Sequence, residues 1–255
     1  MKLVTLVENT ACRTGLAAEH GLSLYFEVGG HRLLFDAGQS GAFAENAEKL
    51  GVDLKAVDMA ILSHGHYDHG GGLGRFLEIN GTAPVYVNRY AFAPHYNAKG
   101  KYIGLEKALE KNDRLIFTDG AVSLGKGISL RTLSCAPADT SGLTVLEAGS
   151  LLPEDFRHEQ YLLVEEGAKK ILLSGCSHKG VLNIVKHFQP DILIGGFHFM
   201  KIEDNAILQN AAEALLQYPT IYYTGHCTGE KQYAYLKSIM GERLRCLSTG
   251  TVIDV

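Results

Sequence analysis

Short apolar runs alternate along the chain with segments whose apolar residues recur every three or four positions. The runs are typical of strands, and the wider spacing is typical of helices. Strands are predicted at 3–7, 22–28, 31–35, 56–63, 84–88, 128–133, 143–147, 191–196, 220–225, 244–248 and 251–255, with a hairpin over 161–175. Helices are predicted at 42–50, 73–79, 105–115, 180–188, 205–218 and 230–239. This order indicates one α/β domain over 1–255, with 89–125 as an elaboration that shapes or covers a site.

Five of the apolar runs end in a polar or histidine-bearing turn. The turn residues are Asp36, His64 with His66, Cys176 with His178, His198, and His226. Ligands in α/β proteins collect where strands run out into loops, because the sheet holds the loop residues in place. We therefore expect these side chains to share one edge of the fold and to form a site.

The stretch ILSHGHYDHGGG at 61–72 places three histidines and an aspartate within six positions. His64 and His66 are two apart, so an extended chain projects both from the same face. The following glycines allow a tight turn, which directs Asp68 and His69 toward a second position. Imidazole and carboxylate donors suit zinc, and also manganese or iron. The motif predicts one or two ions, and two ions about 3.5–4 Å apart would polarise a phosphoryl or carbonyl oxygen.

The remaining histidines are less distinctive. His178 and His226 stand at strand ends, where ligation and a structural role are both open. His198 is open between ligation, orienting a ligand and contacting substrate. Asp36 is expected to orient a ligand histidine, although it could equally cap the turn that follows it. The histidines without such a setting are expected on the surface or in loops: His20, His31, His95, His158 and His187.

Together these motifs resemble the metallo-β-lactamase superfamily. SHGHYDHGGGL, SGCSHKGV, GGFHF and GHCTGE resemble, more narrowly, a subgroup of dihydropterin ribofuranosylaminobenzene-phosphate synthases, over essentially the whole chain. The resemblance implies an αββα sandwich of two mixed sheets, with helices on the outer faces and a metal site at one sheet edge. It also implies a set of metal ligands: His64, His66, Asp68, His69 and His226, with His178 from the subgroup's own CSH motif.

Cys176 departs from the superfamily pattern, because most members have at this position an aspartate that bridges two metals. Cys176 could bridge as a thiolate, ligate one ion, or stand aside while His178 takes over. The resemblance implies a metal-dependent hydrolase or transferase, with Asp68 or a metal-bound hydroxide as base and His198 as a second catalytic candidate. An iron-dependent oxidoreductase in the same ligand frame and a non-catalytic metal-binding or sensing module remain open.

Two of the motif turns, SHKG and CTGE, lead directly into predicted helices. Helix N-termini offer free N–H groups and partial positive charge, which suit phosphate. Ser177 and Thr228 are candidate hydroxyl donors and Lys179 a candidate cation for an anionic small-molecule substrate, although Ser and Thr are also common N-caps. Tyr67, inside the metal motif, is a candidate for stacking on a planar substrate.

Composition narrows the setting. The net charge of −4 comes from well-mixed residues without a basic stripe, so nucleic-acid binding is not indicated. Glu8 and Asn9 interrupt the first apolar run, and no segment approaches the roughly 18 apolar residues of a membrane span. The five cysteines are scattered without a CxxC pair, which suits a reducing compartment. We expect a cytoplasmic protein.

Overall fold

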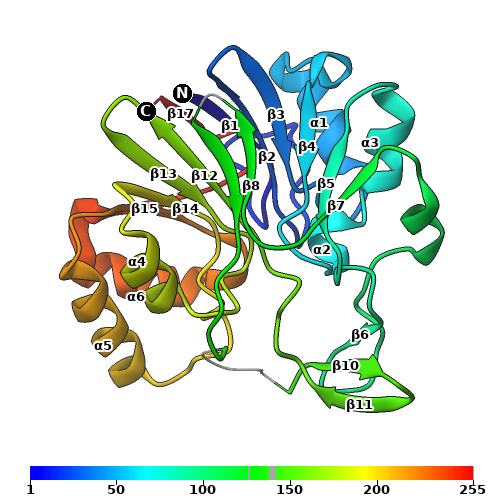
Figure 1. The fold of residues 1–255 in the computed structure, drawn as a ribbon. Helices are drawn as coiled ribbons and strands as arrows, with labels where there is room; N and C mark the ends of the chain where they lie inside the picture. Colours follow the sequence, from blue (N-terminus) through cyan, green and yellow to red (C-terminus); the bar gives the residue numbers. More distant parts are fainter. Residues whose placement is uncertain (126, 138–141, 255) are drawn as a thin grey trace.

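Two mixed β-sheets pack face to face and carry helices on their outer faces (Figure 1). This computed structural model describes residues 1–125, 127–137 and 142–254. The predicted αββα sandwich is confirmed.

The first sheet has the strand order β17-β1-β2-β3-β4-β5-β7. Its strands are β1 (Lys2–Val7), β2 (Ser23–Val28), β3 (His31–Phe35), β4 (Met59–Ile61), β5 (Val85–Asn88), β7 (Leu115–Thr118) and β17 (Val252–Asp254). The outer face is covered by α1 (Ala42–Leu50) and α3 (Leu73–Ile79), linked to the short 3₁₀ turn η1 (Leu54–Ala56). The helix α2 (Tyr67–Gly70) lies at the edge of this sheet, inside the histidine motif.

The second sheet has the order β16-β15-β14-β13-β12-β9-β8. Its strands are β8 (Val122–Gly125), β9 (Ile128–Arg131), β12 (Tyr161–Glu166), β13 (Lys169–Leu173), β14 (Ile192–Ile194), β15 (Ile221–Thr224) and β16 (Leu244–Cys246). Its outer helices are α4 (Val181–Phe188), α5 (Asn205–Leu216) and α6 (Glu230–Met240), with 3₁₀ turns η3 (His226–Thr228) and η4 (Gly241–Arg243). A third, small sheet of order β11-β10-β6 joins β6 (His95–Tyr96), β10 (Thr144–Glu147) and β11 (Ser150–Pro153).

Three apolar layers hold this arrangement together. The middle layer lies between the sheets, where Leu3, Phe26 and Phe35 share one cluster with Leu162 and Ile194. The other two layers lie between each sheet and its own helices. Because central strands such as β4 and β14 are buried on both faces, their apolar runs are continuous rather than alternating.

Parallel strands bring the polar turns together. The strands β3, β4, β5 and β7 pair in parallel, as do β13, β14, β15 and β16. The carboxyl ends of parallel neighbours meet at one edge of a sheet, and the two edges lie on the same side of the sandwich (Figure 1). The histidine-bearing turns therefore face one another across the two sheets.

The segment 89–125, which was expected to be an elaboration, instead supplies one strand to each main sheet. The helix expected at 105–115 is only the 3₁₀ turn η2 (Lys107–Lys111), followed by β7 of the first sheet. The turn has no buried residue, so no apolar face stabilises a longer helix. The segment also supplies β8 to the second sheet, so only the part around β6 lies outside the sandwich. No helix in the described ranges is long and apolar enough to cross a membrane.

Candidate metal centre

Buried donor side chains from both sheets converge at this shared edge. The first sheet contributes Asp36 after β3, and the motif residues His64 to His69 after β4. The second sheet contributes Cys176 and His178 after β13, His198 after β14 and His226 after β15. The structure brings together the side chains that the sequence places at five separate strand ends.

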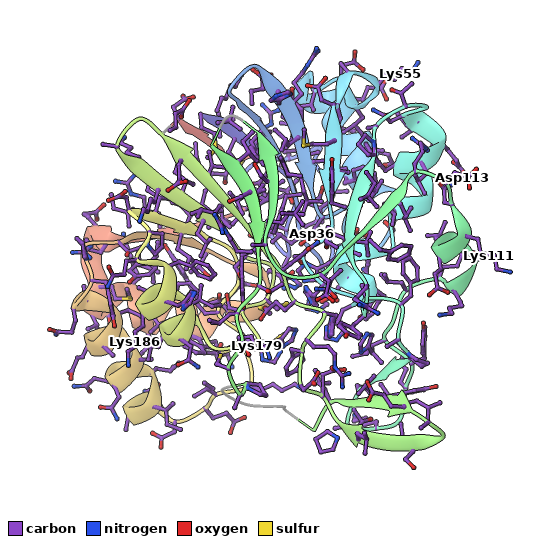
Figure 2. All side chains as sticks on the ribbon, viewed as in Figure 1. Asp36, Lys55, Lys111, Asp113, Lys179 and Lys186 are labelled. Atoms are coloured by element: carbon purple, nitrogen blue, oxygen red, sulfur yellow. The ribbon has the colours of Figure 1, made fainter. Side chains whose placement is uncertain are left out.

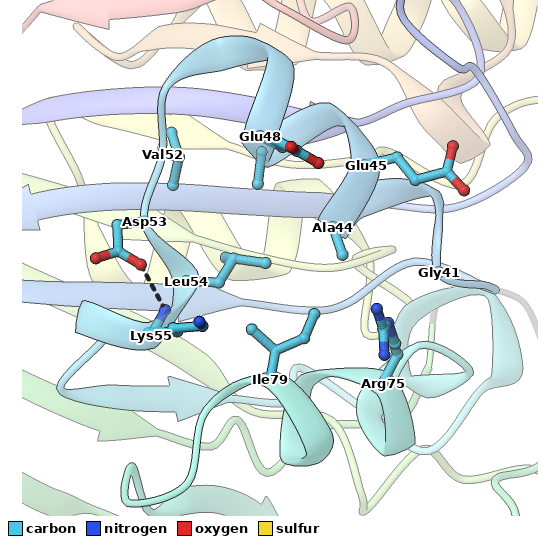
Figure 3. A pocket seen from close by; sticks show the side chains of 11 residues that line it. Gly41, Ala44, Glu45, Glu48, Val52, Asp53, Leu54, Lys55, Arg75 and Ile79 are labelled. Carbon is cyan, nitrogen blue, oxygen red and sulfur yellow. Dashed lines mark hydrogen bonds between the residues drawn. The ribbon is translucent and has the colours of Figure 1, made fainter.

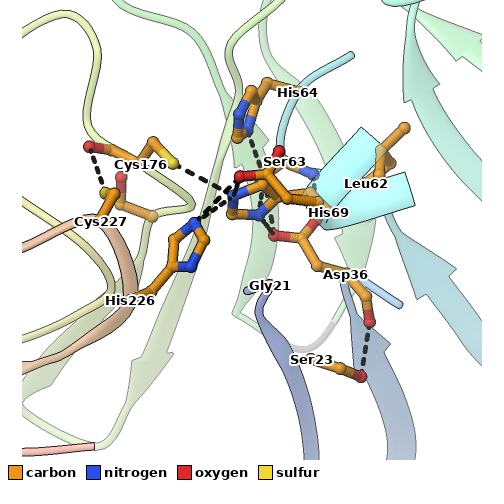
Figure 4. A network of polar contacts seen from close by, with 12 residues as sticks. Gly21, Ser23, Asp36, Leu62, Ser63, His64, His69, Cys176, His226 and Cys227 are labelled. Carbon is orange, nitrogen blue, oxygen red and sulfur yellow. Dashed lines mark hydrogen bonds and ion pairs between the residues drawn. The ribbon is translucent and has the colours of Figure 1, made fainter. Parts of the chain in front are cut away.

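Asp36 organises the half of the centre that comes from the first sheet (Figure 4). Its Oδ1 accepts the backbone N–H of Ser63 at 2.7 Å, and its Oδ2 accepts the Ser63 hydroxyl at 2.8 Å and His69 Nδ1 at 2.7 Å. The Ser63 oxygen lies 2.8 Å from His64 Nδ1. Because the Ser63 proton is given to Asp36, His64 donates from Nδ1 to Ser63. His64 and His69 therefore both keep an Nε2 lone pair for the centre.

His226 is fixed in the same tautomer from the other side. Its Nδ1 lies 3.0 Å from Asn9 Oδ1, which is an acceptor, so the ring proton is on Nδ1. Its backbone N–H donates to the buried carboxylate of Glu8. His226 has a positive φ of 50°, which is uncommon for a residue other than glycine. The contacts around the turn at the end of β15 hold it in this conformation.

A first donor group consists of Asp68, His69, Cys176 and His226. His69 Nε2 lies 3.1 Å from both Cys176 Sγ and His226 Nε2, and His226 Nε2 lies 3.3 Å from Asp68 Oδ2. Tetrahedral zinc ligands at ordinary bond lengths are about 3.3–3.6 Å apart. Two imidazole lone pairs that face each other at this distance are repulsive unless a cation lies between them. The group fits a tetrahedral ion closely.

A second donor group adjoins the first. His64, Cys176 and His178 form one set of close donors, and His64, His66 and Asp68 form another. The Nε2 atoms of His64 and His66 and both ring nitrogens of His178 are buried and have no hydrogen-bond partner within the described ranges. Buried polar atoms are nearly always satisfied, so this concentration of unpaired nitrogens fits a second ion. Cys176 and Asp68 each belong to donor sets of both positions.

Electrostatics keep most of these rings neutral. Burial lowers the pKa of His64, His66 and His178 well below the usual histidine value, and lowers that of His226 to about 4 despite Asp68. A neutral imidazole is the form that ligates a cation. His69 differs: burial lowers its pKa, but the carboxylates of Asp36 and Asp68 outweigh burial and raise it.

The two non-histidine donors respond to burial in different ways. Burial raises the pKa of Asp68, but His69, His20 and His226 together hold it well below the usual carboxyl range. Asp68 is thus a carboxylate. Burial raises the pKa of the Cys176 thiol well above its ordinary value, with Cys227 adding to the effect. A bound cation reverses this preference, because coordination stabilises the thiolate.

The candidate substrate residues divide by their contacts. Lys179 Nζ donates to the carbonyl oxygens of Cys135 and Asp155 at 2.9 and 2.6 Å, so its charge is engaged by backbone. Figure 2 shows Lys179 and Asp36 inside the outline of the molecule and Lys55 and Asp113 at its rim. Thr228 Oγ1 is buried, accepts the N–H of Phe197 and contacts Thr224, which is a structural role.

Ser177 and Tyr67 come from different sheets, Ser177 after β13 of the second sheet and Tyr67 after β4 of the first. Ser177 has a positive φ of 58°, and its hydroxyl contacts Ser174 at 2.9 Å. Tyr67 begins α2 and packs against the apolar cluster of Ile103, Leu143 and Phe156, so it braces the motif against the segment that carries the small sheet.

An apolar cleft of about 570 Å³ opens beside the second donor group. Its lining includes Ser177, His178, Phe197, His198 and Phe199, together with residues of α4 and α5. His198 is half-buried, and its ring centroid is 4.4 Å from that of His178. Another hollow, of about 500 Å³, lies between α1 and α3 (Figure 3). Acidic and basic side chains such as Glu48 and Arg75 line it, and no histidine is among its lining residues.

Comparison with known families identifies the architecture. The sequence pattern of the Metallo-beta-lactamase superfamily matches residues 17–226. The chain belongs to this superfamily. Its αββα sandwich is thus the fold of a known family of proteins.

Relatives within the superfamily cover the whole chain. A 7,8-dihydropterin-6-methyl-4-(beta-D-ribofuranosyl)-aminobenzene-5'-phosphate synthase from Methanocaldococcus jannaschii is 28% identical, with 99% of this chain and 96% of the relative covered. A metal-dependent hydrolase of the beta-lactamase superfamily, whose crystal structure is known, is 27% identical in sequence. The two structures align with a TM-score of 0.83 over 100% of this chain and 99% of the hydrolase chain. The metallo-beta-lactamase fold protein YhfI from Bacillus subtilis shares the fold, with 16% identity, a TM-score of 0.63, and coverage of 99% and 98%.

Of the histidines expected on the surface or in loops, His20 and His158 lie in loops as expected and His95 lies on β6, but all three lie close to the donor groups. His95 and His158 are buried, and His20 Nε2 lies 3.3 Å from Asp68 Oδ2. None of them directly follows a strand of the main sheets. The expectation that ligands collect where strands run out into loops therefore does not point to them. His31 and His187 remain at least partly exposed, as expected.

Several carboxylates and polar partners were also missed by the sequence argument. Asn9 and Ser63 fix the rings of ligand candidates. Glu8 accepts the backbone N–H of His226, and Glu159 accepts the backbone N–H groups of His178 and Lys179 at 2.8 and 2.9 Å. Glu8 and Asn9 interrupt an apolar run just as Asp36 ends one, and this interruption is the one signal in the sequence that points to them.

Proposed function

We propose that this protein is a metal-dependent enzyme, a hydrolase or transferase, that acts on a phosphate-bearing small molecule through two metal ions. The observation that carries the proposal is the pair of adjoining donor groups that share Asp68 and Cys176. Zinc bound there would polarise a phosphoryl oxygen and lower the pKa of a bound water toward neutrality. Cys176, which belongs to donor groups of both positions, would help to hold either ion as a thiolate.

The residues of the first ion would be Asp68, His69, Cys176 and His226, and those of the second His64, His66 and His178. Asp36, Ser63 and Asn9 would hold the rings with their Nε2 lone pairs toward the ions. Asp68 would hold the attacking water by a hydrogen bond, because its carboxylate is ionised and already contacts three histidines. His198, at the boundary between the cleft and His178, would transfer a proton to the leaving group.

The apolar cleft supports a substrate with a flat apolar portion next to its phosphate. Phe197 and Phe199 line the cleft, and a cleft of this size suits one or two rings. The similar synthase from M. jannaschii carries a dihydropterin and a ribofuranosyl-aminobenzene 5'-phosphate in its name, and both contain flat rings. We propose a cytoplasmic location and an anionic small molecule as the partner.

Metal content per chain tests this proposal directly. Protein purified without added metal or chelator would be analysed by elemental mass spectrometry. About two zinc or manganese ions, reduced to about one in His66→Ala and unchanged in His187→Ala, would support it. Iron would favour an oxidoreductase in the same ligand frame. Two ions without turnover of any phosphate ester would favour a binding or sensing module.

A further inference from the structure

A third cluster of buried donors lies outside the two donor groups assigned above, although it reaches His66. His95 lies on β6, and Glu154 and His158 follow β11, so this cluster comes from the small sheet rather than from the sandwich. His95, Glu154 and His158 are each no more than 2% exposed. One ligand atom from each of His66, His95, Glu154 and His158 lies within 4.8 Å of the others.

The proton on His95 is placed by Glu154. Glu154 Oε2 lies 2.6 Å from His95 Nδ1, and a carboxylate is an acceptor, so the ring proton is on Nδ1. Burial raises the pKa of Glu154, but His158 and His95 outweigh burial and hold it well below its usual range. The lone pair of His95 is therefore on Nε2, which is buried and has no hydrogen-bond partner in the part of the chain described.

His158 carries its proton on the opposite nitrogen. Its Nδ1 accepts the backbone N–H of Gly65 at 2.8 Å, so the proton of the neutral ring lies on Nε2. That nitrogen lies 3.6 Å from Glu154 Oε1. His158 thus accepts a hydrogen bond that holds the histidine motif in place, and the nitrogens of this cluster that are left for an ion are Nε2 of His66 and Nε2 of His95.

His95 shares the arrangement of the ligand candidates His64, His69 and His226. In all four, an acceptor fixes the proton on Nδ1 and leaves an Nε2 lone pair in the centre. In most metal sites a ligating histidine donates its other ring N–H to a carboxylate, a backbone carbonyl or a water. His95 and His66 pack edge to face with ring centroids 5.5 Å apart, so their nitrogens can approach one ion.

We propose that His95 and His66 bind one metal ion through their Nε2 atoms, and that Glu154 is the positioning residue of His95. The inference rests on the metal binding proposed above, and it adds a donor that the sequence motifs do not include. Coordination by His95 would tie the small sheet to the sandwich, so metal binding would order the segment that borders the site.

Cobalt(II) substitution and metal competition test the role of His95. With one ion in the His66 position, His95→Ala is expected to weaken cobalt binding about 100-fold or more and to alter the visible absorption spectrum, which reports the ligand set. Glu154→Gln keeps the shape but removes the charge, and is expected to weaken binding about 10- to 100-fold. His187→Ala, an exposed histidine, is the matched control and should change neither.

Two further variants separate the possible failures. His95→Gln retains a polar side chain beside Glu154, so it guards against loss of folding in His95→Ala, and circular dichroism of the metal-free proteins checks the fold. If the His95 variants bind cobalt as the wild type does while His66→Ala does not, the ligand role of His95 is wrong and the proposed function stands. If His66→Ala also binds normally, both proposals fail.

Discussion

At the scale of single residues, the orientation of the histidine rings matters more than their number. Asp36 receives three donors and thereby decides which nitrogen of His69, and through Ser63 which nitrogen of His64, faces the centre. The sequence predicts Asp36 as an orienting carboxylate because it directly follows an apolar run. The sequence does not reveal that Glu154 does the same for His95, since 59 positions separate the two residues and neither follows a main-sheet strand.

Asp36→Asn is expected to weaken metal binding about 10- to 100-fold while the chain still folds. Asparagine tolerates the positive φ of 59° at this position, but its amide presents donors where His69 and Ser63 also donate. Competition with a chromogenic chelator would measure the effect. Asp119→Asn, at an exposed ion pair with Arg89, is the control, and an equal loss in both variants would contradict the orienting role.

At the scale of elements, the long and strongly patterned segments were predictable and the short ones were not. The hairpin of β12 and β13 turns at Gly167, whose φ of 64° explains the glycine, as expected. The strand β11 was missed because all four of its residues are exposed and one is proline. Of the three strands of the small sheet, only β10 was predicted, at 143–147, although the sheet delivers His95 and leads into Glu154.

Gly175→Ala is expected to lower metal affinity and destabilise the protein, because the turn after β13 runs against the first sheet. A Cβ there would lie 2.3 Å from Ser63 Oγ and 2.9 Å from His64 Nδ1, so the Ser63–His64 pair would have to move. Gly74→Ala, in α3, is the matched control. Its nearest neighbour would be 3.8 Å away, and helix propensity should stabilise the protein by about 0.5–1 kcal/mol. Thermal unfolding and metal titration of both variants would test this prediction. Equal effects of Gly175→Ala and Gly74→Ala on stability and metal affinity would contradict it.

At the scale of the whole molecule, the two sheets assemble a centre that neither could form alone. The first sheet brings His64, Asp68 and His69, and the second brings Cys176 and His226. The fold class and this convergence were predictable from the rule of strand ends. The contribution of a third unit, the small sheet, was not, because it depends on chain segments without periodicity. The result is a cluster of buried, mostly neutral histidines at the junction of three sheets.

This cluster predicts that the metal-free protein loses stability on mild acidification. Burial lowers the pKa of His158 and of His226 to about 4, whereas both have a pKa of about 6.5 in the unfolded chain. Between these values the unfolded chain binds protons that the folded chain does not, so the free energy of unfolding falls as the pH falls. Each residue would contribute about 1.4 kcal/mol per pH unit, to at most about 3 kcal/mol. His69, whose pKa is raised, titrates above this window.

Urea unfolding of chelator-treated protein at pH 7.5, 6.0 and 5.0 would measure this slope. His158→Gln should remove about half of the part due to these two residues, because glutamine does not titrate. Bound metal should steepen the loss, since the ligands must stay neutral to hold it and acid would release it. A free energy of unfolding that stays constant from pH 7.5 to 5.0 in the metal-free chain would mean that the histidines are already solvated. The buried, unpaired nitrogens on which the proposed metal centre rests would then not exist in solution.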